Sequence, residues 1–196
     1  MKVKKSDIFK FIKLTGAIEE LSIGSVLTLE EDDPKATLRT IYIELDTNVN
    51  YEKVWQLKVD TRGRRNDDLR LFAFEAKKPE TILFTCNIEE KELAILPIEM
   101  KSTVDMKKAV NTIKKFEFGI KFALMFSFLN DFQEFTVSIR PILFAGSSLE
   151  DDVKSYLNQT HSITLHTSVS FLYVPILKDG ISNDSLFFLS DFLNFP

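Results

Sequence analysis

A cluster of arginines is the strongest concentration of binding chemistry in the sequence. Four of the six arginines lie within nine residues: Arg62, Arg64, Arg65 and Arg70. Planar guanidinium groups bind phosphate and carboxylate oxygens, often through two hydrogen bonds at once. The segment therefore predicts a loop that binds a nucleic-acid backbone, a phosphate ligand or an acidic partner.

Acidic residues beside the arginines support an alternative interpretation of the same loop. Asp60, Asp67 and Asp68 can neutralise the guanidinium groups and leave only a solvated, charged loop. The chain also has a net charge of -4, whereas proteins that coat nucleic acid rely on a broad basic surface. We therefore rank nucleic-acid or phosphate binding second among the functions that the sequence favours.

Side chains that usually perform acid–base, nucleophilic or metal chemistry are sparse. The two histidines, His161 and His166, would point to opposite faces of a strand, so they do not form a paired metal site. The single cysteine, Cys86, lies in a strand-like apolar segment and cannot form an intrachain disulfide. The six glycines form no phosphate-binding loop. We predict no catalytic residues, no metal site and no cofactor, and an enzyme ranks last.

The apolar pattern from Phe116 to Phe144 predicts a β-hairpin at the centre of the chain. Every second residue of its first half is apolar: Phe116, Phe118, Ile120, Phe122, Leu124, Phe126 and Phe128. On a strand this alternation gives one apolar face. Asn130 and Asp131 are suited to the two-residue turn of a hairpin. We expect the rest of the chain to be arranged around the buried face of this ribbon.

Helical and strand periods alternate along the remaining sequence. Apolar residues at helical spacing from Ile8 to Leu21 predict an N-terminal helix, and those from Val104 to Ile113 predict another. A third helix is expected from Ser147 to about Leu157, because Ser147 and Glu150 have capping-box spacing. A period of two predicts short strands at 25–29, 37–46, 54–59, 69–75, 82–88 and 93–98, and a long strand at 162–175.

These elements predict an α+β fold. It comprises an antiparallel N-terminal meander and a C-terminal sheet of long antiparallel strands covered by helices. A chain of 196 residues with 44% hydrophobic content can form one domain of residues 1–196, or divide into two lobes at about residue 100.

The C-terminal tail is too apolar to be a disordered end. It belongs to a chain with 18 phenylalanines, and we expect it either to pack on its own domain or to contact another chain. The candidate interface residues are Phe187, Phe188, Phe192 and Phe195. The first functional hypothesis is therefore a non-enzymatic protein-interaction or assembly module, which self-associates as a homo-oligomer or docks a protein partner through Phe-rich strands and this tail.

No secretory signal and no membrane span are expected. The N-terminus lacks an uninterrupted apolar core, and no uncharged run approaches the ~20 residues of a membrane-spanning helix. These features favour an intracellular, cytoplasmic protein.

Overall fold

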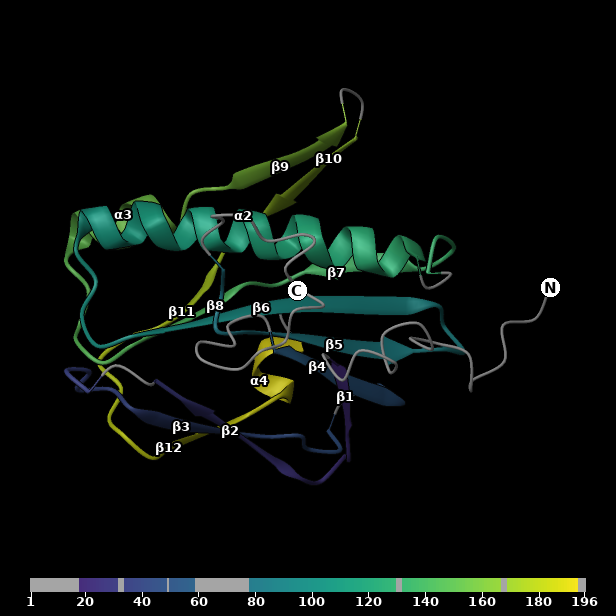
Figure 1. Cartoon of the computed structure of the whole chain (residues 1–196), viewed down its shortest axis with the longest axis horizontal. Coiled ribbons are helices and arrows are strands. Elements are labelled where there is room, and N and C mark those ends of the chain that lie inside the picture. The colour runs from purple at the N-terminus through teal and green to yellow at the C-terminus, as the bar shows by residue number, and fades with distance from the viewer. Residues whose placement is uncertain are drawn as a thin grey trace.

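Three layers make up the part of the chain that the structure describes. This structure is a computed structural model, and it describes residues 18–31, 34–48, 50–58, 78–129, 132–166 and 169–193. A seven-stranded sheet lies in the middle, with two helices and a β-hairpin on one side and a three-stranded sheet and a short helix on the other (Figure 1). The predicted α+β class with mainly antiparallel sheets is confirmed.

The described residues form twelve strands and three helices. The strands are β1 (Ile18–Leu21), β2 (Val26–Glu30), β3 (Thr40–Glu44), β4 (Lys53–Lys58), β5 (Thr81–Asn87), β6 (Glu92–Lys101), β7 (Thr136–Ile139), β8 (Ile142–Ala145), β9 (His161–His166), β10 (Val169–Tyr173), β11 (Ile176–Lys178) and β12 (Ser185–Phe188). The helices are α2 (Met106–Leu129), α3 (Asp151–Leu157) and α4 (Ser190–Leu193).

The central sheet combines an antiparallel meander with parallel additions. Its strand order is β1-β4-β5-β6-β8-β11, and β7 also pairs with β6. Strands β4, β5 and β6 are antiparallel neighbours in this order, as the two-residue period predicted. Strand β1 pairs with β4, and the strands predicted at 25–29 and 37–46 belong to the second sheet as β2 and β3. Strands β7 and β8 run parallel to β6, and β11 runs parallel to β8. The second sheet has the order β12-β3-β2.

Two hydrophobic cores lie on opposite faces of the central sheet. One core lies between this sheet and α2, and it includes Trp55, Phe84 and Phe116. The other lies between the two sheets, where Leu83 and Phe144 meet the side chains of β2, β3 and α4. Every residue of β5 is buried, because both faces of this strand are covered.

The first strand of the predicted hairpin, from Phe116 to Phe128, is instead part of a helix. Residues 106–129 form α2, so the interpretation of the phenylalanine alternation as a strand is wrong. The alternation is compatible with a helix because α2 is buried on more than one side: it contacts β6, α3 and β9. Most of the phenylalanines that the helix distributes around its axis are therefore covered, although Phe128 is 64% exposed. Phe118, Phe122 and Phe126 pack along the helix at four-residue spacing, with ring centroids 6.3 and 5.8 Å apart.

Small residues bring α2 close to the central sheet. Gly119, Ala123 and Ser127 recur every four residues and are buried on one side of the helix. A Cβ atom at Gly119 would lie 2.8 Å from Cγ of Pro79, which lies two residues before the start of β5.

In the part of the chain that the structure describes, no helix is sufficiently long and apolar to cross a membrane.

Three other expectations need correction. Residues 18–21 form β1 rather than the end of a helix, because Ile18 and Leu21 pair with Leu57 and Val54 of β4. The long strand expected at 162–175 is the antiparallel hairpin of β9 and β10. The second half of the expected central hairpin is divided into β7 and β8 at Pro141.

Two expectations hold only in part. The helix expected from Ser147 begins at Asp151, with Glu150 at its N-cap. The N-terminal helix up to residue 17, the strand at 69–75 and the turn at Asn130 and Asp131 lie outside the described residues.

The C-terminal tail packs on its own domain in residues 185–193. Strand β12 pairs with β3, and α4 buries Phe192 completely. The Phe192 ring meets Phe144 edge to face, with centroids 5.8 Å apart. Phe188, by contrast, is 41% exposed.

We expect Gly119→Ala to destabilise the protein by about 1–2 kcal/mol, although alanine is the better helix former. The added methyl group would overlap the ring of Pro79. Denaturant unfolding should therefore show a partial recovery in the double variant Pro79→Ala/Gly119→Ala. A stabilising effect of Gly119→Ala alone would contradict the close approach of α2 to Pro79.

We expect Phe192→Ala to lower the free energy of unfolding by about 3–5 kcal/mol, because it leaves a cavity between the sheets. Phe188→Ala is the matched control, and its effect should be about 1 kcal/mol or less, since the ring is partly exposed. Thermal or urea unfolding of the two variants measures the difference. Equal effects would argue against the docking of α4 in the core.

Candidate functional site

Among the described residues, β7 is one of three strands of the central sheet that pair on one side only, together with the terminal strands β1 and β11. Strands β7 and β8 follow one another beside β6, and β11 pairs with β8 from Ile176 onwards. The residues before Ile176 do not extend β11 along this edge. They belong to β10, which lies outside the sheet and is connected to β11 through Pro175. Among the residues that the structure describes, no strand pairs with the side of β7 that faces away from β6.

The backbone of β7 shows which groups face this open edge. The amide of Thr136 donates to the carbonyl oxygen of Lys91, the residue before β6, at 2.8 Å. The amide of Arg140, the residue after β7, donates to the carbonyl oxygen of Ile95 in β6 at 2.9 Å. Successive residues of a strand direct their backbone groups to opposite edges. The N–H and C=O groups of Val137 and Ile139 therefore point away from β6.

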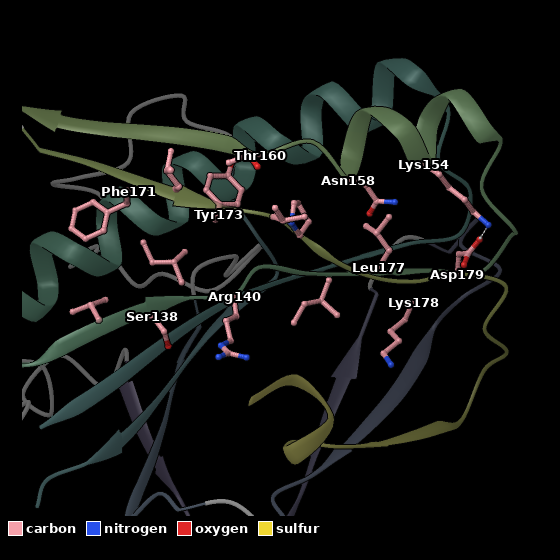
Figure 2. Close-up of a pocket in the computed structure, with 16 residues that line it drawn as sticks. Ser138, Arg140, Lys154, Asn158, Thr160, Phe171, Tyr173, Leu177, Lys178 and Asp179 are labelled. Atoms are coloured by element: carbon pink, nitrogen blue, oxygen red, sulfur yellow. Dashed lines mark ion pairs between the residues drawn. The ribbon is translucent and has the colours of Figure 1, made fainter. Parts of the chain in front are cut away.

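A cavity of about 880 Å³ lies along this edge, and we call it the edge groove. It is bounded by residues 137–140, in and just after β7, and by residues 171–179, from β10 to just after β11. Lys154 of α3 and two residues that follow this helix, Asn158 and Thr160, complete the lining (Figure 2). The volume is in the range typical of ligand-binding clefts. The groove is thus formed where the chain changes direction at Pro175.

The side of the groove towards α2 is apolar. Val137, Ile139, Phe171 and Leu177 all pack against the core beneath α2, yet each remains only partly buried. Leu172 and Val174 at the rim are 68% and 44% exposed. Apolar surface that is left accessible beside a sheet edge favours contact with another molecule.

The side of the groove towards α4 is polar and basic. Figure 2 shows Arg140 and Lys178 directed to this side. An N–H of Arg140 donates to the carbonyl oxygen of Phe192 at 3.3 Å, and Nζ of Lys178 lies 5.6 Å from the centre of the Phe192 ring. Burial lowers the pKa of Arg140, but a guanidinium group stays charged at neutral pH.

An ion pair lies at the α3 end of the groove. Nζ of Lys154 is 3.0 Å from Oδ2 of Asp179, and the same oxygen accepts a hydrogen bond from the amide of Leu149 at 2.9 Å. The Leu149 amide and Lys154 lower the pKa of Asp179. The described residues that line the groove thus include three basic side chains and one acidic side chain, which leaves an excess of positive charge.

Two buried polar groups lie beside the apolar wall. The hydroxyl of Tyr173 and Nε2 of His161 have no hydrogen-bond partner among the described residues, and the two rings are 5.5 Å apart. Burial, Glu117 and Tyr156 raise the pKa of Tyr173, so its hydroxyl keeps the proton. The described residues contain no group of three or more His, Cys, Asp or Glu side chains placed to hold a metal ion.

A second cluster of charges lies between α2 and the ends of β5 and β6. Glu99 is fully buried, and its Oε1 lies 2.5 Å from Nζ of Lys115 and 2.6 Å from Nζ of Lys101. Glu80 and Glu31 lie 3.5 and 3.7 Å from Lys101. Two lysines therefore face three carboxylates.

The excess of carboxylates has a consequence for protonation. Burial, followed by the charge of Glu99, raises the pKa of Glu80 to about 7, although Lys101 and Lys115 oppose this effect. The same carboxylates, Glu99 foremost, raise the pKa of Lys101 against the effect of its burial. The cluster connects α2 to the sheet and contains a group that titrates near neutral pH.

None of the candidate residues chosen from the sequence is among the described residues that line the edge groove. Arg62, Arg64, Arg65 and Arg70 lie outside the described residues, as does Phe195. Phe192 is buried in the core, Phe187 is half-buried with its ring 4.9 Å from that of Phe144, and Phe188 is exposed. The assignment of the four arginines as a binding site and that of the phenylalanines as an interface both stay predictions.

Sequence reasoning missed the edge groove because it is assembled from three separate segments. The available signal was a pair of prolines, Pro141 and Pro175, each of which interrupts an apolar run. A proline cannot donate to a sheet, so it marks the start of a strand or an edge. That signal does not reveal which strands become neighbours.

We expect Glu80→Gln to raise the free energy of unfolding above pH 7 by roughly 2–3 kcal/mol. Because the folded-state pKa of about 7 exceeds the ordinary value of 4.5, the contribution of Glu80 is full below pH 4.5 and is lost as the pH rises to about 7. Urea unfolding at several pH values should show a flatter profile for Glu80→Gln. Glu89→Gln, at an exposed position, is the control. An unchanged profile in Glu80→Gln would contradict this assignment.

Comparison with known proteins found no match to the chain among protein-family models, curated proteins or solved structures. A function therefore has to be argued from the geometry and charges of the edge groove.

Proposed function

We propose that the protein is a non-enzymatic protein-interaction module that docks a segment of a partner protein in the edge groove. The observation that supports this most directly is the open edge of β7, with the backbone groups of Val137 and Ile139 directed into a groove. A sheet edge of this kind is a template for another chain, and natural proteins usually cover or blunt such edges. Here the adjacent wall is apolar rather than charged.

The shape of the groove favours an extended segment over a globular surface. β7 has four residues, so its edge spans roughly 13 Å. The residues of β10 lie opposite this edge, so that only a narrow segment of chain can enter the groove (Figure 2). Strand addition to a sheet edge is a common way in which domains bind peptides, since the main chain supplies affinity and the side-chain pockets supply specificity.

The charge of the groove favours a different protein over a second copy of this chain. If β7 paired with β7 of a second copy around a two-fold axis, Arg140 and Lys178 of both copies would approach one another. Like charges at an interface are unfavourable. Self-association, which the phenylalanine pattern also predicted, is therefore the second outcome to test.

Selection from a library of displayed peptides tests the proposal. We expect the protein to select peptides whose affinity falls about tenfold in the double variant Leu172→Ser/Val174→Ser, because both side chains are exposed at the rim. Leu186→Ser is the control, since Leu186 is 50% exposed on β12 and does not line the groove.

Two results would contradict docking in the groove. One is the recovery of no binding peptide, and the other is binding that the rim variants leave unchanged. Light scattering of the purified protein distinguishes the alternative, because a stable homo-oligomer that dissociates in Leu172→Ser/Val174→Ser would favour self-association through the same surface.

A further inference from the structure

We propose that the occupant of the edge groove is an extended peptide segment in which apolar and acidic residues alternate, and that it adds to β7 as a further strand. This inference rests on the proposed function and specifies the partner of the same groove. It follows from three properties of the edge: its backbone groups, its apolar side and its basic side.

The backbone of β7 offers hydrogen bonds with strand spacing. The amides of Thr136 and Arg140 are engaged by β6 and by the residue before it, so Val137 and Ile139 present their N–H and C=O groups to the groove. The next strand on this side, β11, begins at Ile176, whose amide donates to the carbonyl oxygen of Pro141 at 2.8 Å. An added strand would therefore occupy the position that β11 leaves vacant beside β7.

The two sides of this position have opposite chemical character. Towards α2, an added side chain would contact Val137, Ile139, Phe171 and Leu177, which are apolar and only partly buried. Because side chains alternate along a strand, the residues between would point towards α4. There they would meet Ser138, Arg140 and Lys178.

The positive charge on this side favours acidic residues in the occupant. Lys178 lies on this side, as does Arg140, whose guanidinium also donates to Phe192 within the fold. The one acidic residue among the described lining residues, Asp179, forms an ion pair with Lys154. A carboxylate in the occupant would be attracted to this side, and a lysine or arginine would be repelled. Nucleic acid fits less well, because the opposite side of the same groove is apolar.

The probe is a fluorescein-labelled nine-residue peptide in which valine alternates with glutamate. Fluorescence anisotropy should show that it binds at least about tenfold more tightly than two comparison peptides. One has lysine in place of glutamate, and the other has the same composition arranged as a valine block and a glutamate block. Equal binding of all three would overturn the inference.

N-methylation of the probe tests strand pairing directly. In an antiparallel pair the amides of the valine residues would face β7, and in a parallel pair those of the glutamate residues would face it. Methylation of one set should therefore abolish binding, and methylation of the other should leave it largely intact. The sensitive set gives the direction of the strand. Equal sensitivity or insensitivity of both sets would overturn strand addition.

Lys178→Glu tests the basic side. We use Lys178 because Arg140 also donates to Phe192 within the fold. Lys178→Glu should weaken binding of the valine–glutamate peptide about five- to tenfold, and the loss should shrink at high salt. Lys121→Glu makes the same change of charge at an exposed position of α2 outside the groove and should have no effect. Equal effects would overturn the role of the basic side.

The peptide-library selection separates failure of this inference from failure of the proposed function. If the selected peptides are sensitive to Leu172→Ser/Val174→Ser but lack alternation of apolar and acidic residues, the groove docks a partner of another chemistry. If no peptide binds at the groove, both proposals fail.

Discussion

Burial of both faces of the central sheet is the constraint on which the rest of the structure depends. Strand β5 is buried throughout, and its neighbours β4 and β6 contribute side chains to both cores. A strand in this position needs a cover on each side. Helix α2 provides one cover, and the small sheet with α4 provides the other (Figure 1).

The close contact of α2 with the sheet brings charged groups into the interior. Glu99 is fully buried beneath Lys115 and next to Lys101. Taking charges out of water is costly unless they are paired, and removing one partner leaves a buried charge. The packing of α2 and the protonation of Glu80 are therefore linked, because the same approach that buries the phenylalanines of α2 also excludes water from these carboxylates.

Among the described residues, no strand pairs with the outer side of β7. Residues before Ile176 could have extended β11 beside β7. Instead they form the β9–β10 hairpin above α2, which Pro175 connects to β11. One change of direction thus leaves an open strand edge, an apolar wall and a basic side within one groove. The proposed function depends on this combination rather than on any single residue.

The local sequence pattern was sufficient to predict an element correctly when one of its faces is buried and the other is in solvent, or when the element is a short buried strand. Strands β2 to β6, the presence of helices near residues 104–113 and 147–157, and the apolar character of the tail follow from residue types and periods. The same reasoning failed for residues 116–128. There the two-residue alternation and the four-residue spacing of Gly119, Ala123 and Ser127 coexist, and the helix carries apolar residues on most of its sides.

The sequence by itself determined the α+β class, the antiparallel strands β4, β5 and β6, and the scarcity of acid–base residues. Only the tertiary structure decided that residues 106–129 form one helix, that residues 18–21 pair with β4, and that the edge of β7 faces a groove. The physical reason is that the period of apolar residues distinguishes a helix from a strand only when part of the element's surface is polar and faces solvent. An element that is apolar on most of its sides has no such clear period. Which segments become neighbours is set by long-range packing, and the edge groove is made of segments that meet only in the folded chain.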